Sequence, residues 1–169
     1  MLKSKLMPTV VLSAICVCVV LLLAVVNMFT APIIEAALEQ KVQASLSEVM
    51  SNGGSFEEIN DLDGLPKEIT AAYKAENGGY VFKTEVVGYK SGLIIMCGID
   101  GDGKISGVKM IESSETFGAE ATLDRLFEGK TESDYNTVPV KSGATLTRNG
   151  YGQAMKAAFE AFDKLEGGN

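Results

Sequence analysis

The stretch Leu93-Ile94-Ile95-Met96-Cys97-Gly98-Ile99 decides the fold of this chain of 169 residues. It is a continuous apolar run of strand length, as expected for a central strand that is covered on both faces. Lys90-Ser91-Gly92 precedes it and Asp100-Gly101-Asp102-Gly103 follows it, and both segments have the composition of turns. We therefore expect a strand at 93–99 that is joined to its neighbours by short turns.

The segments on either side also predict strands, at 80–89 and at 104–111. The first of them alternates and places four side chains on one face: Tyr80, Phe82, Thr84 and Val86. The turn that begins at Asp100 is not a calcium loop, because Ile105 and Ile111 stand where such a loop requires Gly and Glu. The three strands together predict an antiparallel meander.

Helical patterns surround these strands. Apolar residues recur at helical spacing over 33–50, a short helix is expected over Lys67–Ala75, and Ala121–Phe127 predicts another. A final helix presents one apolar face and stops at Gly167-Gly168. That face consists of Tyr151, Met155, Ala158, Phe159, Phe162 and Leu165. The predicted fold class is α+β, an antiparallel sheet with flanking helices.

The segment Met7–Phe29 is apolar and uncharged, and it is long enough to cross a bilayer as one helix. Lys3 and Lys5 precede it, whereas the first basic residue after it is Lys41. The positive-inside rule therefore predicts a single-pass protein of the cell membrane, with a cytoplasmic N-terminus and an extracytoplasmic domain after Thr30. A cleavable signal peptide is the alternative, but the apolar core is longer than is usual for one.

The composition excludes several classes of function. The net charge is -7, which argues against nucleic acid as a partner. The chain has no histidine, so a histidine-based triad and a haem with histidine ligands are excluded. Its three cysteines do not suffice for an iron–sulfur cluster with four thiolates, and a metal site is not expected. Cys97 is interpreted as a small buried side chain, although it has the chemistry to lend one ligand to a cluster shared with a partner.

Ser142-Gly143-Ala144-Thr145-Leu146-Thr147 stands just before the final helix. A glycine lets the backbone approach a bulky phosphate, and the hydroxyls of Ser142, Thr145 and Thr147 are hydrogen-bond donors. The N-terminus of the following helix would attract an anion. A Ser/Thr-rich helix cap with no ligand is the plain alternative.

The order of these parts resembles the FMN-binding domain family, which includes the G subunit of Rnf complexes and the C subunit of the sodium-pumping NADH:quinone reductase. The resemblance rests on the hairpin Gly88–Val108, on Glu115-Thr116-Phe117-Gly118 and on Ser142–Thr145. It covers the anchor and most of the chain from Gly79 onward. Two features depart from the usual family pattern. Phe117-Gly118-Ala119-Glu120 stands where Pro-Gly-Leu-Gly is common, and Pro139 stands where an acidic residue is common.

The resemblance implies that FMN is joined to the side-chain oxygen of Thr145 by a phosphoester, with Thr147 as the fallback acceptor. Ser142, Gly143, Ala144 and Leu146 would surround the attachment point. Glu115 and Thr116 would lie near the flavin ring or its ribityl chain. No residue of the chain is expected to be catalytic by itself.

The family further implies an electron-relay subunit between ferredoxin and NAD in an ion-translocating Rnf complex. Its partners would be the other integral membrane subunits of the complex and, during maturation, a flavin transferase that uses FAD. The predicted division is an anchor at 1–30, a helical connector at 31–78 and an FMN-binding domain at 79–169.

Two alternatives stay open. The chain is short, which favours the Rnf protein over the C subunit of the quinone reductase. A membrane-anchored binding module with no redox role is the alternative from another class.

Overall fold

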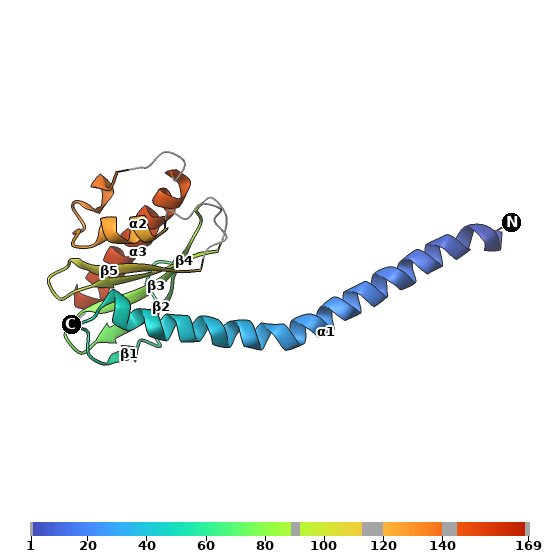
Figure 1. The fold of residues 1–169 in the computed structure, drawn as a ribbon, viewed down its shortest axis with the longest axis horizontal. Helices are drawn as coiled ribbons and strands as arrows, with labels where there is room; N and C mark the ends of the chain where they lie inside the picture. The colour runs from blue at the N-terminus through green and yellow to red at the C-terminus, as the bar shows by residue number, and fades with distance from the viewer. Residues whose placement is uncertain (1, 89–91, 113–119, 140–144, 168–169) are drawn as a thin grey trace. The chain divides into compact units, whose positions relative to one another are not determined.

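The computed structural model describes residues 2–88, 92–112, 120–139 and 145–167. Its contacts divide the chain into two compact units, Met1–Gln40 and Lys41–Asn169. Helix α1, Leu2–Val49, supplies the described part of the first unit and extends into the second (Figure 1). The segments predicted to be an anchor and a following helix therefore form one continuous helix.

Among the described residues, α1 is the one helix long and apolar enough to cross a membrane. Its large apolar side chains from Val10 to Ile34 are exposed; Leu22, for example, is 67% exposed. Such a surface is stable in a lipid environment and costly in water. The finding fits the predicted single-pass membrane protein.

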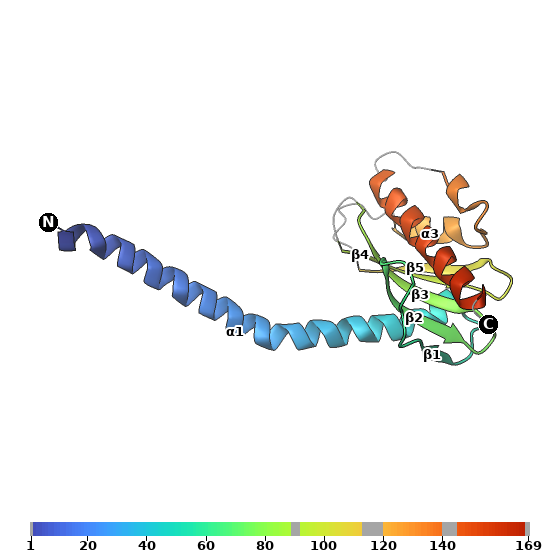
Figure 2. The same ribbon diagram turned by 180° about the vertical axis from the view of Figure 1, so that it is seen from behind.

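The second unit contains a five-stranded antiparallel sheet in the order β1-β2-β3-β4-β5 (Figures 1 and 2). The strands are β1 Phe56–Glu58, β2 Ile69–Ala75, β3 Tyr80–Val86, β4 Leu93–Ile99 and β5 Ile105–Glu112. The last three confirm the predicted meander. The predicted face of β3 is confirmed as well, because its four residues are buried and the Thr84 hydroxyl donates to the Ile95 carbonyl at 3.0 Å.

The prediction of a short helix over Lys67–Ala75 is wrong. Ile69–Ala75 is strand β2, which pairs with β3 from Ile69↔Thr84 to Lys74↔Tyr80. The turn between the two strands contains Gly78 at φ +87°, a conformation that favours glycine. The alanines of this segment suit a helix, but pairing with a hydrophobic neighbouring strand decides its conformation.

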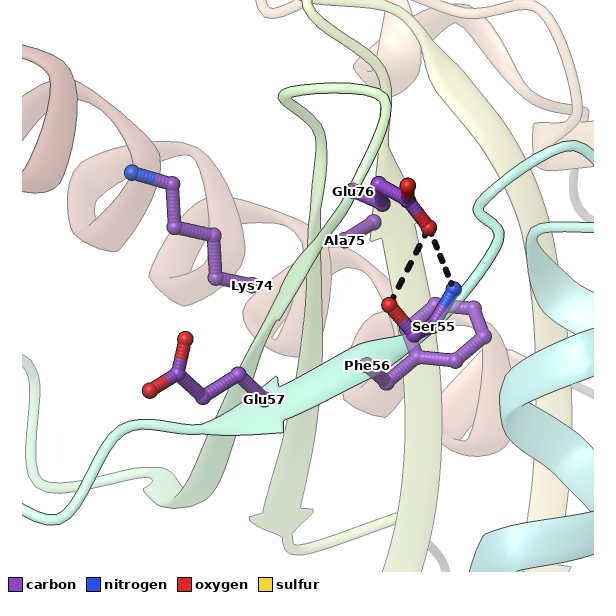
Figure 3. A pocket seen from close by; sticks show the side chains of 6 residues that line it. All are labelled: Ser55, Phe56, Glu57, Lys74, Ala75 and Glu76. Atoms are coloured by element: carbon purple, nitrogen blue, oxygen red, sulfur yellow. Dashed lines mark hydrogen bonds between the residues drawn. The ribbon is translucent and has the colours of Figure 1, made fainter.

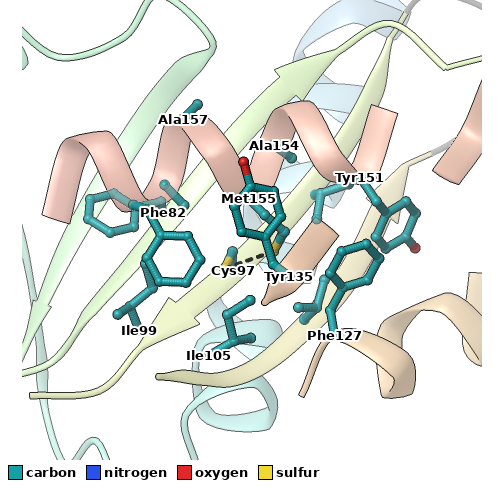
Figure 4. Close-up of a cluster of buried hydrophobic side chains, with 14 of the residues drawn as sticks. Phe82, Cys97, Ile99, Ile105, Phe127, Tyr135, Tyr151, Ala154, Met155 and Ala157 are labelled. Atoms are coloured by element: carbon teal, nitrogen blue, oxygen red, sulfur yellow. Dashed lines mark hydrogen bonds between the residues drawn. The ribbon is translucent and has the colours of Figure 1, made fainter. Parts of the chain in front are cut away.

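Three helical elements follow the sheet: α2 Glu120–Phe127, the 3₁₀ turn η1 Tyr135–Thr137, and α3 Thr145–Gly167. Helix α3 packs on β2, β3 and β4, and α2 packs on β5. Figure 4 shows the resulting core, in which Phe127 stacks on Tyr151 with ring centroids 5.6 Å apart. The predicted helices at 121–127 and at the C-terminus are confirmed.

Cys97 lies in this core, with its Sγ 3.4 Å from the Sδ of Met155. Burial in apolar surroundings raises the pKa of the Cys97 thiol far above its usual value. The thiolate, the form that binds metals, is therefore disfavoured, and Cys97 packs as an apolar side chain.

The opposite face of the sheet receives the C-terminal end of α1, where Val42, Leu46 and Val49 are buried. The backbone of Val49 lies so close to the sheet that a Cβ at Gly107 would be 2.4 Å from its carbonyl oxygen. The Ser106 hydroxyl donates to the same oxygen at 3.0 Å. The sheet is thus covered on both faces, as the apolar composition of 93–99 predicts.

The turn after β4 is a hairpin turn, as expected. The Gly103 N–H donates to the Asp100 carbonyl at 3.0 Å, and the N–H groups of Asp102 and Lys104 donate to the Asp100 carboxylate. The carboxylate of Asp100 is thus used within the turn itself.

Candidate functional site

Thr145 is the first residue of α3, and its side chain is exposed. The first turn of an α-helix has N–H groups without intrahelical partners, and it forms the positive end of the helix dipole. The first turn of α3 contains no acidic residue. The start of α3 therefore presents a hydroxyl where negative charge is favoured.

The start of α3 is tied to the chain upstream by one side chain. Arg148 donates from Nη2 to the Asn136 carbonyl at 2.6 Å and from Nε to the Val138 carbonyl at 3.2 Å. Asn136 belongs to η1, and Val138 is the first residue after η1. The two bonds join the chain on either side of residues 139–147.

The upstream side of this junction is itself fixed in the core. Tyr135 is buried, with its ring centroid 5.7 Å from that of Phe159 of α3, and Val138 is 3% exposed. Asp134 accepts hydrogen bonds from the Thr131 N–H at 2.6 Å and the Thr131 hydroxyl at 2.9 Å. These bonds lower the pKa of Asp134 below its ordinary value.

The second turn of α3 lies against the sheet at Gly150. A Cβ there would be 2.9 Å from Cδ2 of Leu93 and 3.3 Å from the carbonyl oxygen of Val87. The next residue, Tyr151, is fully buried and donates from its hydroxyl to Asp124 of α2 at 2.6 Å. The N-terminal half of α3 is therefore held by β3, β4 and α2 together.

Two large apolar side chains are exposed in the described part of the second unit: Val87 after β3 at 61%, and Leu146 of α3 at 52%. Val87 also lines a depression of about 330 Å³, together with Gln153 of α3 and the charged residues Lys67, Glu68 and Glu85. Gln153 stands seven residues after Leu146, so the two share one face of the helix. Apolar surface is thus available beside the exposed hydroxyl of Thr145.

A second depression, of about 310 Å³, lies at β1 and β2 (Figure 3). The Ser55 hydroxyl and N–H donate to the Glu76 carboxylate there, at 3.1 and 3.4 Å. Glu57 lines it too. Lys74 lines this depression as well, so charge does not distinguish it from the depression at Val87, which two carboxylates and one lysine also line. The start of α3 is the better candidate site because it presents an exposed hydroxyl at the positive end of a helix.

Of the predicted site residues, the structure describes Thr145, Leu146 and Thr147. The first two side chains are exposed, and Thr147 is 7% exposed. The other predicted site residues lie outside the described residues: Ser142, Gly143, Ala144, Glu115 and Thr116.

The sequence alone did not identify Arg148 or the pair Tyr151–Asp124 as residues that hold this site. Arg148 follows Thr145 by three residues, so one helical turn relates them, and this spacing was the available signal. The partner of Tyr151 comes from a different helix, and no local pattern indicates it.

Comparisons with known proteins find similar sequences along most of the chain. The FMN-binding domain model matches residues 88–160, and the model of the RnfG N-terminal region matches residues 1–49. The G subunit of the Na⁺-translocating ferredoxin:NAD⁺ oxidoreductase complex of Acetobacterium woodii is 24% identical to this chain over an alignment 186 positions long, gaps included, which covers 92% of this chain and 88% of that protein. Two successive family models and a relative aligned along nearly the whole chain lead to one conclusion: the chain is similar to the G subunit of an Rnf complex, and its residues 88–160 match the FMN-binding domain.

Proposed function

We propose that this chain is an electron-carrying subunit of an ion-translocating ferredoxin:NAD oxidoreductase (Rnf) complex, and that it holds FMN covalently on Thr145. The observation that carries the proposal is the exposed Thr145 hydroxyl at the first position of α3, inside the segment matched by the FMN-binding domain model. The other subunits of the complex and the membrane are its proposed partners, in agreement with the complex named for the Acetobacterium woodii relative.

The residues present fit an FMN group. Thr145 supplies an exposed hydroxyl, and the start of α3 carries no carboxylate that would repel a phosphate. Leu146 and Val87 supply exposed apolar surface suited to a flavin ring. When bound, FMN accepts and passes on one or two electrons, which is the chemistry an electron relay needs.

Attachment requires FAD as co-reactant and a flavin transferase as catalyst. The Thr145 hydroxyl oxygen forms a bond to the flavin-side phosphorus of FAD, and the bond from that phosphorus to the AMP oxygen breaks. AMP leaves and the hydroxyl proton is released, so no electron is transferred. A covalent bond keeps the cofactor on a domain that we propose to be extracytoplasmic, where no pool of FMN would replace a lost one.

The attachment point is tested by Thr145→Val, which removes the hydroxyl and nearly keeps the shape. We expect no flavin on this variant by intact-mass spectrometry and no in-gel fluorescence after denaturation. Thr145→Ser keeps a hydroxyl and is expected to remain modifiable. Thr147→Val is the matched control and should carry FMN, because Thr147 is buried. FMN retained on Thr145→Val would overturn the assignment.

We further propose that Glu115 and Thr116 lie near the flavin, with Ser142, Gly143, Ala144 and Leu146 around the attachment point. Thr147 is the fallback acceptor only in the sense that we would assign it if Thr145→Val kept its FMN. A negative charge near the ring disfavours the anionic reduced flavin. Glu115→Gln should therefore raise the midpoint potential while FMN stays attached to Thr145. A redox titration of the flavinylated variant measures it, and an unchanged potential would place Glu115 away from the ring.

We also propose that the chain divides into an anchor at 1–30, a helical connector at 31–78 and an FMN-binding domain at 79–169, and that the flavin is held by the last of these.

The C subunit of a sodium-pumping quinone reductase is the nearest alternative function, and the match to the RnfG N-terminal region at 1–49 favours the Rnf protein. A binding module with no redox role would leave the denatured protein colourless.

A further inference from the structure

Arg148 connects the two ends of the segment 139–147, which contains Thr145. Its guanidinium donates to two carbonyls, of Asn136 at 2.6 Å and of Val138 at 3.2 Å. The bonded residues are separated in sequence by 12 and 10 positions. Because both acceptors precede residue 139 and the donor follows residue 147, the two bonds bring together the ends of that segment.

Buried residues hold the chain on both sides of the segment 139–147. Upstream, Tyr135 and Val138 are buried. Downstream, Gly150 and Tyr151 are buried one turn after the donor, against the sheet and α2. Arg148 is thus the link between two fixed parts of the core, and Thr145 lies between them.

A first helical turn frays readily because its ends lack part of the backbone ladder. Thr145 occupies such a turn and is exposed, so packing alone does not hold it. Hydrogen bonds from a charged donor are stronger than neutral ones, and a planar guanidinium reaches two acceptors at a fixed spacing. The geometry therefore provides a specific restraint on the turn that carries the acceptor hydroxyl.

We propose that Arg148 is a positioning residue for flavin attachment: it holds the first turn of α3 so that the Thr145 hydroxyl is presented to the flavin transferase in one orientation. The inference rests on the proposed function of Thr145. It assigns Arg148 a role through the backbone, and it differs from a role in which the Arg148 charge binds the phosphate.

The geometry favours the backbone role. Two of the three guanidinium nitrogens already donate to carbonyls, Nε and Nη2. The third, Nη1, lies 3.7 Å from the position that a Cβ would take on Gly152. Gly152 is one turn further into α3 than Arg148, whereas Thr145 is one turn before it, so Nη1 faces away from the attachment point.

The test compares Arg148→Lys, Arg148→Met and the wild type as full chains in detergent, with purified flavin transferase and FAD. Lysine keeps the charge, but its single ammonium does not reproduce the planar fork that serves both carbonyls. If loss of the restraint lowers the fraction of chains with Thr145 presented, the KM for the acceptor chain rises by about ten-fold in both variants, while kcat stays within about two-fold.

Two controls separate positioning from other effects. Lys156→Ala removes a cation from the exposed Lys156–Glu160 pair of the same helix and should leave KM unchanged. Gly107→Ala disturbs the packing of the end of α1 on the sheet face opposite α3, and it should lower the melting temperature without changing KM. A KM effect in the Arg148 variants that exceeds that of Gly107→Ala at equal loss of melting temperature is therefore not a stability effect.

Hydrogen exchange on the unmodified chain gives a readout independent of the flavin. Amides 149–151 donate to the carbonyls of the first turn of α3, so we expect faster exchange at these amides in both Arg148 variants and no change at 155–165. Wild-type kinetics for Arg148→Lys with slow modification of Arg148→Met would assign the charge role and overturn the proposal, as would unchanged exchange at 149–151. A wild-type chain modified at a residue other than Thr145 would overturn the proposed attachment site, which mass spectrometry reports separately.

Discussion

At the scale of single residues, the carboxylate of Asp134 stabilises the turn that leads to the candidate site. It accepts from the N–H and the hydroxyl of Thr131 and pairs with Lys130 at 3.2 Å. The pKa of Asp134 is lower in the folded chain than in the unfolded chain, chiefly because of the bonds from Thr131. Its stabilising contribution is therefore complete above the ordinary pKa of aspartate, about 3.9, and is lost as the pH falls through the lower folded pKa.

Asp134→Asn should accordingly lower the melting temperature at neutral pH. The difference from the wild type should shrink below pH ~4 and vanish once Asp134 is protonated in the folded chain. Thermal melts across an acid pH series measure this. Asp102→Asn removes an exposed carboxylate from the turn after β4 and controls for net charge. A difference that stays constant across the series would show that the Asp134 charge does not stabilise the turn.

At the level of single residues, the sequence predicted only features that local chemistry determines. The Ser/Thr motif and the predicted start of the final helix together placed the Thr145 hydroxyl at the beginning of that helix. The acceptors of Arg148 are backbone carbonyls, and carbonyls carry no sequence signature. The partner of Tyr151 depends on how α2 packs against α3, which the sequence around Tyr151 does not specify.

At the scale of elements, the end of α1 and the sheet meet at glycines of two neighbouring strands. Gly98 and Gly107 pair across β4 and β5, and Val49 lies over both. A Cβ at Gly107 would be 2.4 Å from the Val49 carbonyl oxygen, and backbone atoms in a packed helix end do not move aside at low cost.

Gly107→Ala should therefore destabilise the second unit by about 2 kcal/mol, within the usual range for overpacking. Chemical denaturation of the full chain in detergent, followed by near-ultraviolet circular dichroism, measures the effect. Gly101→Ala is the matched control, since nothing lies within 4 Å of the Cβ position there. Equal stability of the two variants would mean that the end of α1 is not seated on these strands in solution.

The elements that the sequence predicted well have strong periodic patterns, and those it missed do not. The strands at 80–89, 93–99 and 104–111 are continuous or alternating apolar segments. Strand β2 contains three alanines within Ile69–Ala75, and strand β1 has only 3 residues. Each of these two gains its conformation from a neighbouring strand, so pairing, a long-range effect, determined what local propensity did not.

At the scale of the whole molecule, the order of parts was predictable because each part has its own composition. An uncharged apolar segment, a meander of strands and an amphipathic C-terminal helix are distinct patterns, and the structure contains all three. The boundary at Gln40 was not predictable, because α1 continues through it without a change of helical pattern.

The proposed topology places the second unit outside the cytoplasm, and cysteine labelling tests it. Asp102 is exposed in the turn after β4, so Asp102→Cys offers a reactive thiol. The native cysteines interfere little, because Cys97 is buried and Cys16 and Cys18 lie within the apolar segment. A membrane-impermeant maleimide should label Asp102→Cys in intact cells or right-side-out vesicles and fail to label it in inverted vesicles.

Ser4→Cys reports from the other end of the apolar segment and should show the reverse pattern, since Lys3 and Lys5 favour the cytoplasmic side. The opposite pattern in both variants would reverse the orientation and place the proposed flavin on the cytoplasmic side. Labelling of both variants from the same side would show that α1 does not span the membrane. Because the two reporters flank one helix, the orientation follows from their difference, and it does not depend on whether the folded second unit resists a protease.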